Sequence, residues 1–120
     1  MERRISLVVD DEPAIRGYIK LILERECFEA VEAGGGKEAL EILEELGSQV
    51  ELIVSDIHMP EGDGLSFARA AAEAFPELPI ILVSGYTSAG EISDFEFLKK
   101  PFSPDSLLNT IRKVVTARAA

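Results

Sequence analysis

The chain alternates between short, continuously apolar runs and longer segments in which apolar residues recur every three or four positions. Continuous runs rich in β-branched and aromatic residues are typical of strands buried on both faces of a sheet. Recurrence at three and four positions predicts amphipathic helices that cover such a sheet. We expect strands at residues 5–9, 28–33, 52–56, 79–83 and 95–98, and helical stripes at 15–23, 39–46, 65–75 and 107–115.

Residues that favour helix ends mark where two of these helices begin. Pro13 suits the first position of a helix because it lacks an N–H that would have no partner there, and Asp11 or Glu12 lies near the cap. Ser103 and Pro104 give the same signal before the last stripe, with Ser103 as the cap. Both helices are therefore expected to begin only a few residues after a strand ends.

Strands that alternate with helices predict a parallel sheet with helices on both faces and right-handed crossovers. The 120 residues are enough for one domain with a real core. Five strand–helix units match a flavodoxin-like, doubly wound, three-layer α/β/α fold with strand order 2-1-3-4-5. Ligands of this fold bind beyond the carboxyl ends of strands one and three, where the strand order reverses.

Acidic residues fall at that place. The first expected strand ends in Asp10, Asp11 and Glu12, and the third ends in Asp56. A lone aspartate at a strand end also suits a turn, and one or two acids suit the N-terminus of a helix. Three at the end of a buried strand repel one another unless a cation neutralises them. The cluster therefore indicates a site for a divalent cation.

Composition narrows the function further. Lysine and arginine number 12 against 22 aspartates and glutamates, a formal net charge of −10. This charge argues against direct binding to nucleic acid or to an anionic membrane. Cys27 is the only cysteine, so we expect no internal disulfide, a reducing cytoplasmic setting and a small buried side chain. We expect neither an export signal nor a membrane-spanning segment.

Five features, taken in sequence order, resemble the response-regulator receiver domain, the phosphate-accepting module of two-component signalling. Each is unspecific alone, but each stands at the end of its expected strand, and the resemblance covers essentially the whole chain, residues 1–120. The features are the pair Asp10-Asp11, then Asp56, the turn Met59-Pro60 with Asp63-Gly64, Ser84 with Gly85, and Lys100-Pro101.

The resemblance implies a phosphoacceptor and a metal. Asp56 would be the nucleophile that forms an aspartyl phosphate, in a reaction dependent on Mg²⁺ or Mn²⁺. Asp11, Asp56 and the backbone carbonyl of His58 would bind the metal directly, and Asp10 would act mainly through water. Two interpretations of the His58 side chain stay open: an exposed loop residue, or a group that overhangs the phosphoryl group and limits the access of water.

The resemblance also implies how the phosphoryl oxygens are bound. Lys100 would supply a positive charge, Ser84 a hydroxyl, and backbone N–H groups near His58 and Gly85 further donors. The Lys100-Pro101 bond would be cis. Ser84 and Phe97 would form the switch, the hydroxyl moving toward the phosphoryl group while the aromatic side chain turns inward, so we expect Phe97 to be substantially buried.

These implications make the chain a phosphorylation-dependent switch in a phosphorelay. A sensor histidine kinase or phosphotransfer protein would supply the phosphoryl group, and an unknown output protein would receive the signal. The chain would be a regulatory phosphoacceptor that catalyses only its own phosphorylation and dephosphorylation. The alternatives are the receiver module of a hybrid sensor kinase, a haloacid-dehalogenase-like phosphatase, and a flavin carrier. The phosphatase needs a second aspartate at the position of His58, and the acidic cluster disfavours a flavin phosphate.

The fourth crossover is the irregular part of the expected fold. Residues 85–94 are ten positions, whereas a parallel crossover usually takes about a dozen or more. They include two glycines and one aliphatic residue larger than alanine, Ile92, so they hold no apolar stripe. We predict a shortened fourth helix of at most a turn or two. With that helix reduced, we expect the protein to stay monomeric on activation.

Overall fold

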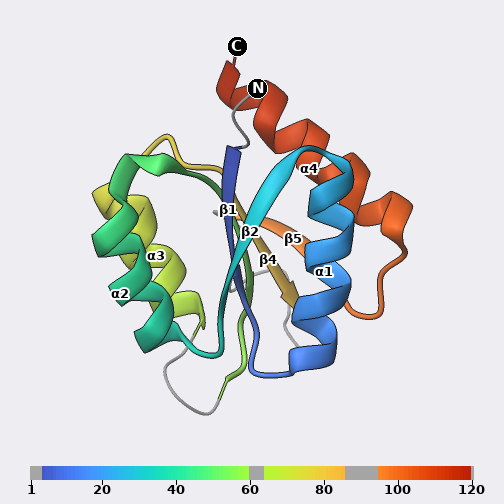
Figure 1. The fold of residues 1–120 in the computed structure, drawn as a ribbon, viewed down its shortest axis with the longest axis horizontal. Coiled ribbons are helices and arrows are strands. Elements are labelled where there is room, and N and C mark those ends of the chain that lie inside the picture. The colour runs from blue at the N-terminus through green and yellow to red at the C-terminus, as the bar shows by residue number, and fades with distance from the viewer. Residues whose placement is uncertain (1–3, 60–63, 86–94, 120) are drawn as a thin grey trace.

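The computed structural model describes residues 4–59, 64–85 and 95–119, and five of their segments form one parallel sheet (Figure 1). The strand order is β2-β1-β3-β4-β5, as predicted. The strands are β1 (Arg4–Val9), β2 (Phe28–Ala33), β3 (Val50–Asp56), β4 (Ile80–Ser84) and β5 (Glu96–Lys99). The helices are α1 (Pro13–Arg25), α2 (Gly36–Leu46), α3 (Gly64–Ala74) and α4 (Pro104–Ala119), with a short 3₁₀ turn at Gly47–Gln49.

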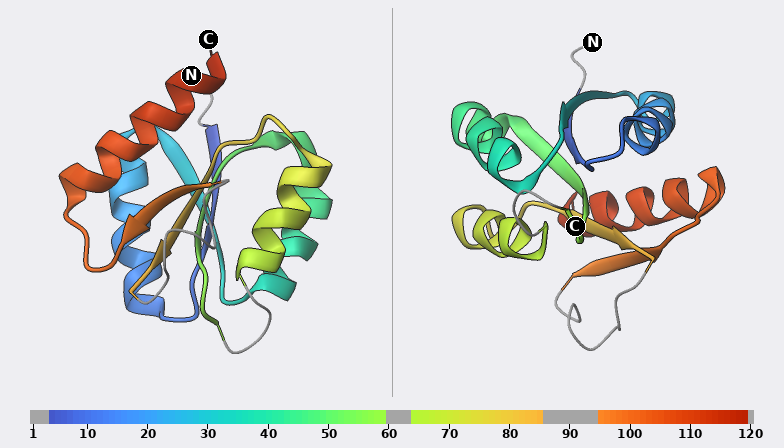
Figure 2. Two further views of the ribbon diagram at one scale, coloured as in Figure 1. Left: turned by 180° about the vertical axis from the view of Figure 1, so that it is seen from behind. Right: turned by 90° about the horizontal axis from the view of Figure 1, so that it is seen from below.

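The helices cover both faces of the sheet and give three layers. Figures 1 and 2 show α1 and α4 on one face and α2 and α3 on the other. Alternate strand residues divide between the two sides, so Leu7 and Val9 pack under α2 and α3 while Val8 packs under α1 and α4. The flavodoxin-like, doubly wound α/β fold is therefore confirmed.

The register of the sheet brings the acidic residues together. Val9 of β1 pairs with Ser55 of β3, so Asp10 and Asp56, the residues that follow, leave the sheet at the same edge. The ladder continues beyond β5, because Lys100 N donates to the carbonyl of Ser84 over 3.0 Å. Backbone pairing thus delivers the ends of β1, β3, β4 and β5 to one place.

In the described part of the chain, each strand begins and ends within two residues of its expected bounds, and each helix begins and ends within four residues of its expected apolar stripe. The helix after β5 is labelled α4, and Ser103 caps it as expected, since Ser103 Oγ accepts a hydrogen bond from Ser106 N over 3.1 Å. The Lys100-Pro101 peptide bond is cis, as the resemblance implied. The shortened fourth helix was expected within residues 85–94, of which 86–94 lie outside the described residues.

Glu12 is at the cap position of α1, as expected, although its side chain makes no capping hydrogen bond. The backbone N–H of Glu12 donates to Asp10 Oδ1 over 2.9 Å. One local expectation is wrong, because Cys27 is exposed rather than buried. The chain turns from α1 into β2 within two residues, Cys27 adopts a φ of 63°, and the buried position is taken by Phe28. In the described part of the chain, no helix is both long and apolar enough to cross a membrane.

Gly64 and Gly17 both lie in helices but in opposite surroundings. A Cβ on Gly64 would lie 1.8 Å from the carbonyl oxygen of Asp56, whereas a Cβ on Gly17 would meet nothing within 4 Å. We predict that Gly64→Ala lowers the free energy of unfolding by about 1–3 kcal/mol because backbone must move. The matched variant Gly17→Ala should raise it by about 0.5–1 kcal/mol, since alanine favours the helix. Urea denaturation checks both, and equal effects of the same sign would contradict the prediction.

Candidate functional site

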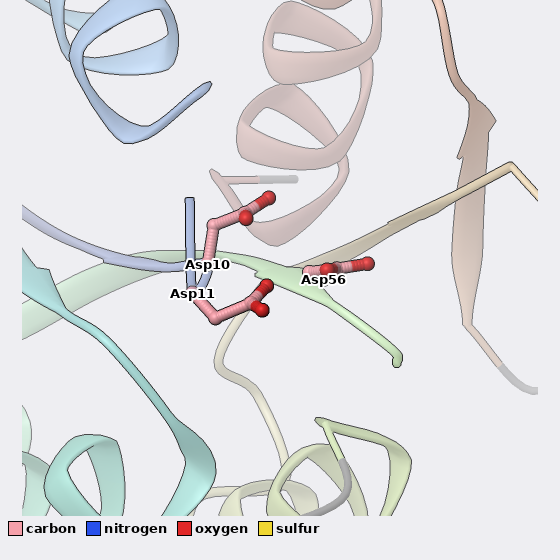
Figure 3. Close-up of side chains that lie close together, drawn as sticks. All are labelled: Asp10, Asp11 and Asp56. Carbon is pink, nitrogen blue, oxygen red and sulfur yellow. The ribbon is translucent and has the colours of Figure 1, made fainter. Parts of the chain in front are cut away.

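Three carboxylates meet at the carboxyl edge of the sheet. Asp10 and Asp11 follow β1, Asp56 ends β3, and Figure 3 shows their side chains projecting to the same side. One carboxylate oxygen of each lies within 4.8 Å of those of the other two. Asp10 is fully buried, Asp56 is 6% exposed, and Asp11 is exposed. Such a set of oxygen atoms, closely spaced and partly open to solvent, can hold a divalent metal ion.

Lys100 compensates part of this negative charge. Its Nζ donates to Asp10 Oδ2 over 2.9 Å and lies 3.5 Å from Asp56 Oδ2. The lysine side chain is 21% exposed, so the contact with Asp10 is largely shielded from water. One ammonium group therefore serves two carboxylates, and no ion pair to Asp11 is formed among the residues that the structure describes.

The environment shifts the pKa values of the two central groups. Burial raises the pKa of Asp56, the negative charge of Asp10 adds to this, and the positive charge of Lys100 opposes it. Burial on its own would lower the pKa of Lys100, but the hydrogen bond to Asp10 and the charges of Asp10 and Asp56 raise it overall. Lys100 is consequently a permanent positive charge at neutral pH.

A cavity of about 710 Å³ opens over these groups. Its polar side includes Asp11, Asp56, Ser84 and Lys100, and its apolar side includes Ile15, Tyr18 and Phe102. Ser84, the last residue of β4, lines this cavity and is only 1% exposed. The cavity gives a small anionic group access to the carboxylates and the lysine at once.

The other residues predicted for the site are distributed as follows. His58, Gly85 and Pro101 line the same cavity, and the side chain of His58 is exposed, which fits both interpretations of it. Phe97 is not part of the cavity lining; it is partly buried against the core under α2 and α3. The substantial burial expected for Phe97 is thus only partial. In the predicted turn from Met59 to Gly64, residues 60–63 lie outside the described part of the chain.

Two residues of α1 that the sequence analysis did not single out support the site. Arg16 Nη1 donates to the carbonyl oxygen of Asp10 over 2.7 Å, and Arg16 Nε donates to Glu32 Oε1 over 3.2 Å. Tyr18 donates its hydroxyl to the carbonyl of Phe102 over 3.0 Å. The available signal was their position, because both flank Ile15 and Ile19 on a helix that directly follows the acidic pair.

Comparison with known proteins agrees with this arrangement. The family model described as the response regulator receiver domain matches residues 6–112. The chain belongs to this family. Receiver domains are regulatory, so the chain is a phosphorylation-dependent signalling switch of the two-component type. Membership decides against the phosphatase and the flavin carrier as alternatives.

Individual receivers are similar over most of the chain. The sensor kinase CckA of Brucella abortus is 38% identical over 115 residues, which cover 91% of this chain and 12% of that protein. A receiver protein from Sinorhizobium medicae superimposes with a TM-score of 0.89 at 29% identity, covering 98% of both chains. The receiver domain of a hybrid histidine kinase CckA gives 0.79 at 30% identity, covering 92% of this chain and 98% of that one. The chain spans 12% to 46% of the length of such curated relatives.

Replacing Lys100 should show how much its positive charge stabilises the fold against repulsion within the carboxylate cluster. We predict that Lys100→Met lowers the free energy of unfolding by about 1–3 kcal/mol without divalent cations, because the fully buried Asp10 loses its positively charged partner and keeps only the bond from Glu12 N. The loss should shrink in an Asp10→Asn background. The control is Lys99→Met at an exposed position of β5, which should stay within about 0.5 kcal/mol of the original chain. Urea denaturation measures the stability of Lys100→Met, Asp10→Asn, the double variant of these two, and Lys99→Met. Equal losses for the two lysine variants would contradict the interpretation.

Proposed function

We propose that Asp56 is the phosphoacceptor of this receiver and takes its phosphoryl group from a phosphohistidine of a histidine kinase or phosphotransfer protein. The observation that supports this is the position of the Asp56 carboxylate. It lines the cavity, lies 3.5 Å from Lys100 Nζ, and shares the edge of the sheet with two further carboxylates. A nucleophile, a positive charge and a metal-binding set thus converge on one open space.

In this mechanism a carboxylate oxygen of Asp56 attacks the phosphorus atom. The new O–P bond forms as the N–P bond of the phosphohistidine breaks, and the donor protein is left with an unphosphorylated histidine. Lys100 stabilises the negative charge on the phosphoryl oxygens, and the hydroxyl of Ser84 donates to one of them. Attack of water on the phosphorus later releases phosphate and restores Asp56. The chain therefore catalyses only its own phosphorylation and dephosphorylation.

The carboxylates fit Mg²⁺ or Mn²⁺, which prefer oxygen ligands and retain several water molecules. Asp11 and Asp56 would hold the ion directly with the backbone carbonyl of His58, and Asp10 would act mainly through water. When bound, the ion neutralises charge on the transferring phosphoryl group. Asp10 is fully buried and already accepts from Lys100 and from Glu12 N, which agrees with an indirect role.

The setting of the switch follows from the same proposal. We infer that residues 1–120 act as one receiver domain in the cytoplasm, as a monomer, and pass the state of Asp56 to a protein partner whose identity is unknown. The net charge of −10 supports a protein partner over nucleic acid or a membrane surface. Ser84 and Phe97 are the proposed switch pair, on neighbouring strands of the sheet.

A second candidate role is the receiver module of a hybrid sensor kinase. The 38% identity to the sensor kinase CckA favours it, because that relative is itself a kinase and much longer than this chain. The chemistry at Asp56 would be the same, but the phosphoryl group would come from a kinase module in the same polypeptide. The full reading frame distinguishes the two roles.

The acceptor can be tested directly. We expect acetyl phosphate with Mg²⁺ to add one phosphoryl group per chain, and Asp56→Asn to abolish the addition because an amide oxygen is not a competent nucleophile. The matched control is Asp105→Asn, at an exposed position in the first turn of α4, which should be modified as the original chain is. Intact-mass spectrometry measures the addition. Undiminished modification of Asp56→Asn would overturn the assignment.

The role of Asp11 can be separated from the fold. We predict that Asp11→Ala raises the Mg²⁺ concentration for half-maximal phosphorylation by roughly ten-fold or more, since even outer-shell changes have effects of this size. Without metal the variant should be as stable as the original chain or slightly more stable, because one of three like charges is gone.

The matched control is Glu12→Ala, which removes a neighbouring exposed acid outside the cluster. Thermal unfolding in EDTA and a Mg²⁺ titration of the phosphorylation rate provide the two measurements. A large fall in melting temperature for Asp11→Ala without metal would show that Asp11 acts mainly in the structure.

A further inference from the structure

We propose that the hydroxyl of Tyr18 positions Lys100 by fixing the loop between β5 and α4 to α1. The inference rests on the proposed function, in which Lys100 binds the phosphoryl oxygens. Tyr18 itself would not touch the reacting atoms. It would act through the backbone two residues after Lys100, and it would hold the ammonium group in place before phosphoryl transfer begins.

The contact joins two distant parts of the chain. Tyr18 Oη donates to the carbonyl oxygen of Phe102 over 3.0 Å, between residues 84 positions apart. The two aromatic rings also pack together, with centroids 5.8 Å apart and ring planes inclined at 38°. Both side chains line the same cavity as Lys100 and Asp56. The hydroxyl bond is therefore at the rim of the site, and the ring contact supports it from the side.

The bond restrains the lysine from its carboxyl side. On the other side, Lys100 N donates to the carbonyl of Ser84 over 3.0 Å and is held by the sheet. Residues 100–102 therefore form a short span with one fixed point at each end. A short restrained span limits how far the base of the Lys100 side chain can move. Its Nζ can then stay at 2.9 Å from Asp10 and 3.5 Å from Asp56.

The same helix also fixes the acidic half of the site. α1 begins at Pro13, directly after the acidic turn, and Arg16 donates to the carbonyl oxygen of Asp10 over 2.7 Å. Tyr18 lies two residues further along the helix, and its hydroxyl bonds to the carbonyl of Phe102, two residues after Lys100. One rigid element thus holds two backbone carbonyls, those of Asp10 and Phe102. This common attachment sets the distance between the carboxylates and the ammonium group.

Tyr18→Phe tests the proposal because it keeps the ring and removes only the hydrogen bond. We expect phosphorylation by acetyl phosphate to slow roughly three- to ten-fold, the effect of losing one hydrogen bond from the arrangement that reacts. The Mg²⁺ concentration for half-maximal rate should not rise, because the proposed metal ligands are untouched. The control is Thr110→Val, which removes another hydroxyl-to-carbonyl bond, from Thr110 to Ser106 over 2.8 Å on α4. It should leave the rate unchanged.

A double-mutant cycle separates positioning of Lys100 from a general structural effect. The full chain is compared with Tyr18→Phe, Lys100→Gln and the double variant, each by intact mass over time. In the Lys100→Gln background, Tyr18→Phe should change the rate less than two-fold, because there is no longer an ammonium group to position. An equal loss in both backgrounds, or no loss in the original one, would overturn the inference. If the original chain takes up no phosphoryl group, the proposed function fails and this inference fails with it.

Discussion

The structure depends on keeping three carboxylates together at the edge of a buried sheet. At the separations within this cluster, each pair of like charges repels by about 3–4 kcal/mol if the effective dielectric constant is near 20. Lys100 lies close to two of the carboxylates. Because it is far from both of them in the sequence, the tertiary fold must bring it there. One positive charge against three negative charges leaves a formal charge of −2 at the site. A divalent cation is the ligand that brings this total to zero.

The backbone, rather than the side chains, sets the spacing of these charges. Parallel pairing of Val9 with Ser55 brings the ends of β1 and β3 level, and the bond from Lys100 N to the Ser84 carbonyl extends β5 to the same edge. Gly64 packs against the carbonyl of Asp56 so closely that a Cβ has no room. The first residue of α3 can therefore pack against the end of β3 at this distance only because it is glycine.

The sequence predicts those parts of the molecule that depend on local pattern. Apolar runs locate the strands, and the rule for doubly wound sheets then brings Asp10, Asp11 and Asp56 together. The roles of Tyr18 and Arg16 could not be predicted, because their hydrogen-bond partners are backbone carbonyls. Every residue has such a carbonyl, so the sequence carries no signal for these contacts. The exposure of Cys27 was not predicted because cysteine usually favours burial, whereas this cysteine lies at a positive φ in the turn between α1 and β2. Phe97 occupies its expected strand, but its position near one end of an edge strand leaves it partly open.

The charge balance also explains how such a site can work as a switch. An added phosphoryl group carries about two negative charges at neutral pH. On the proposed function, Lys100 must then divide its positive charge between Asp10 and the phosphoryl oxygens. A fully buried carboxylate loses stability when its charged partner moves away, so the approach of the phosphoryl group alters the pairing of Lys100 with Asp10. Residues 100–102 link that change to Tyr18 and hence to α1. The electrostatic pairing that stabilises the resting site is thus the pairing that phosphorylation must rearrange.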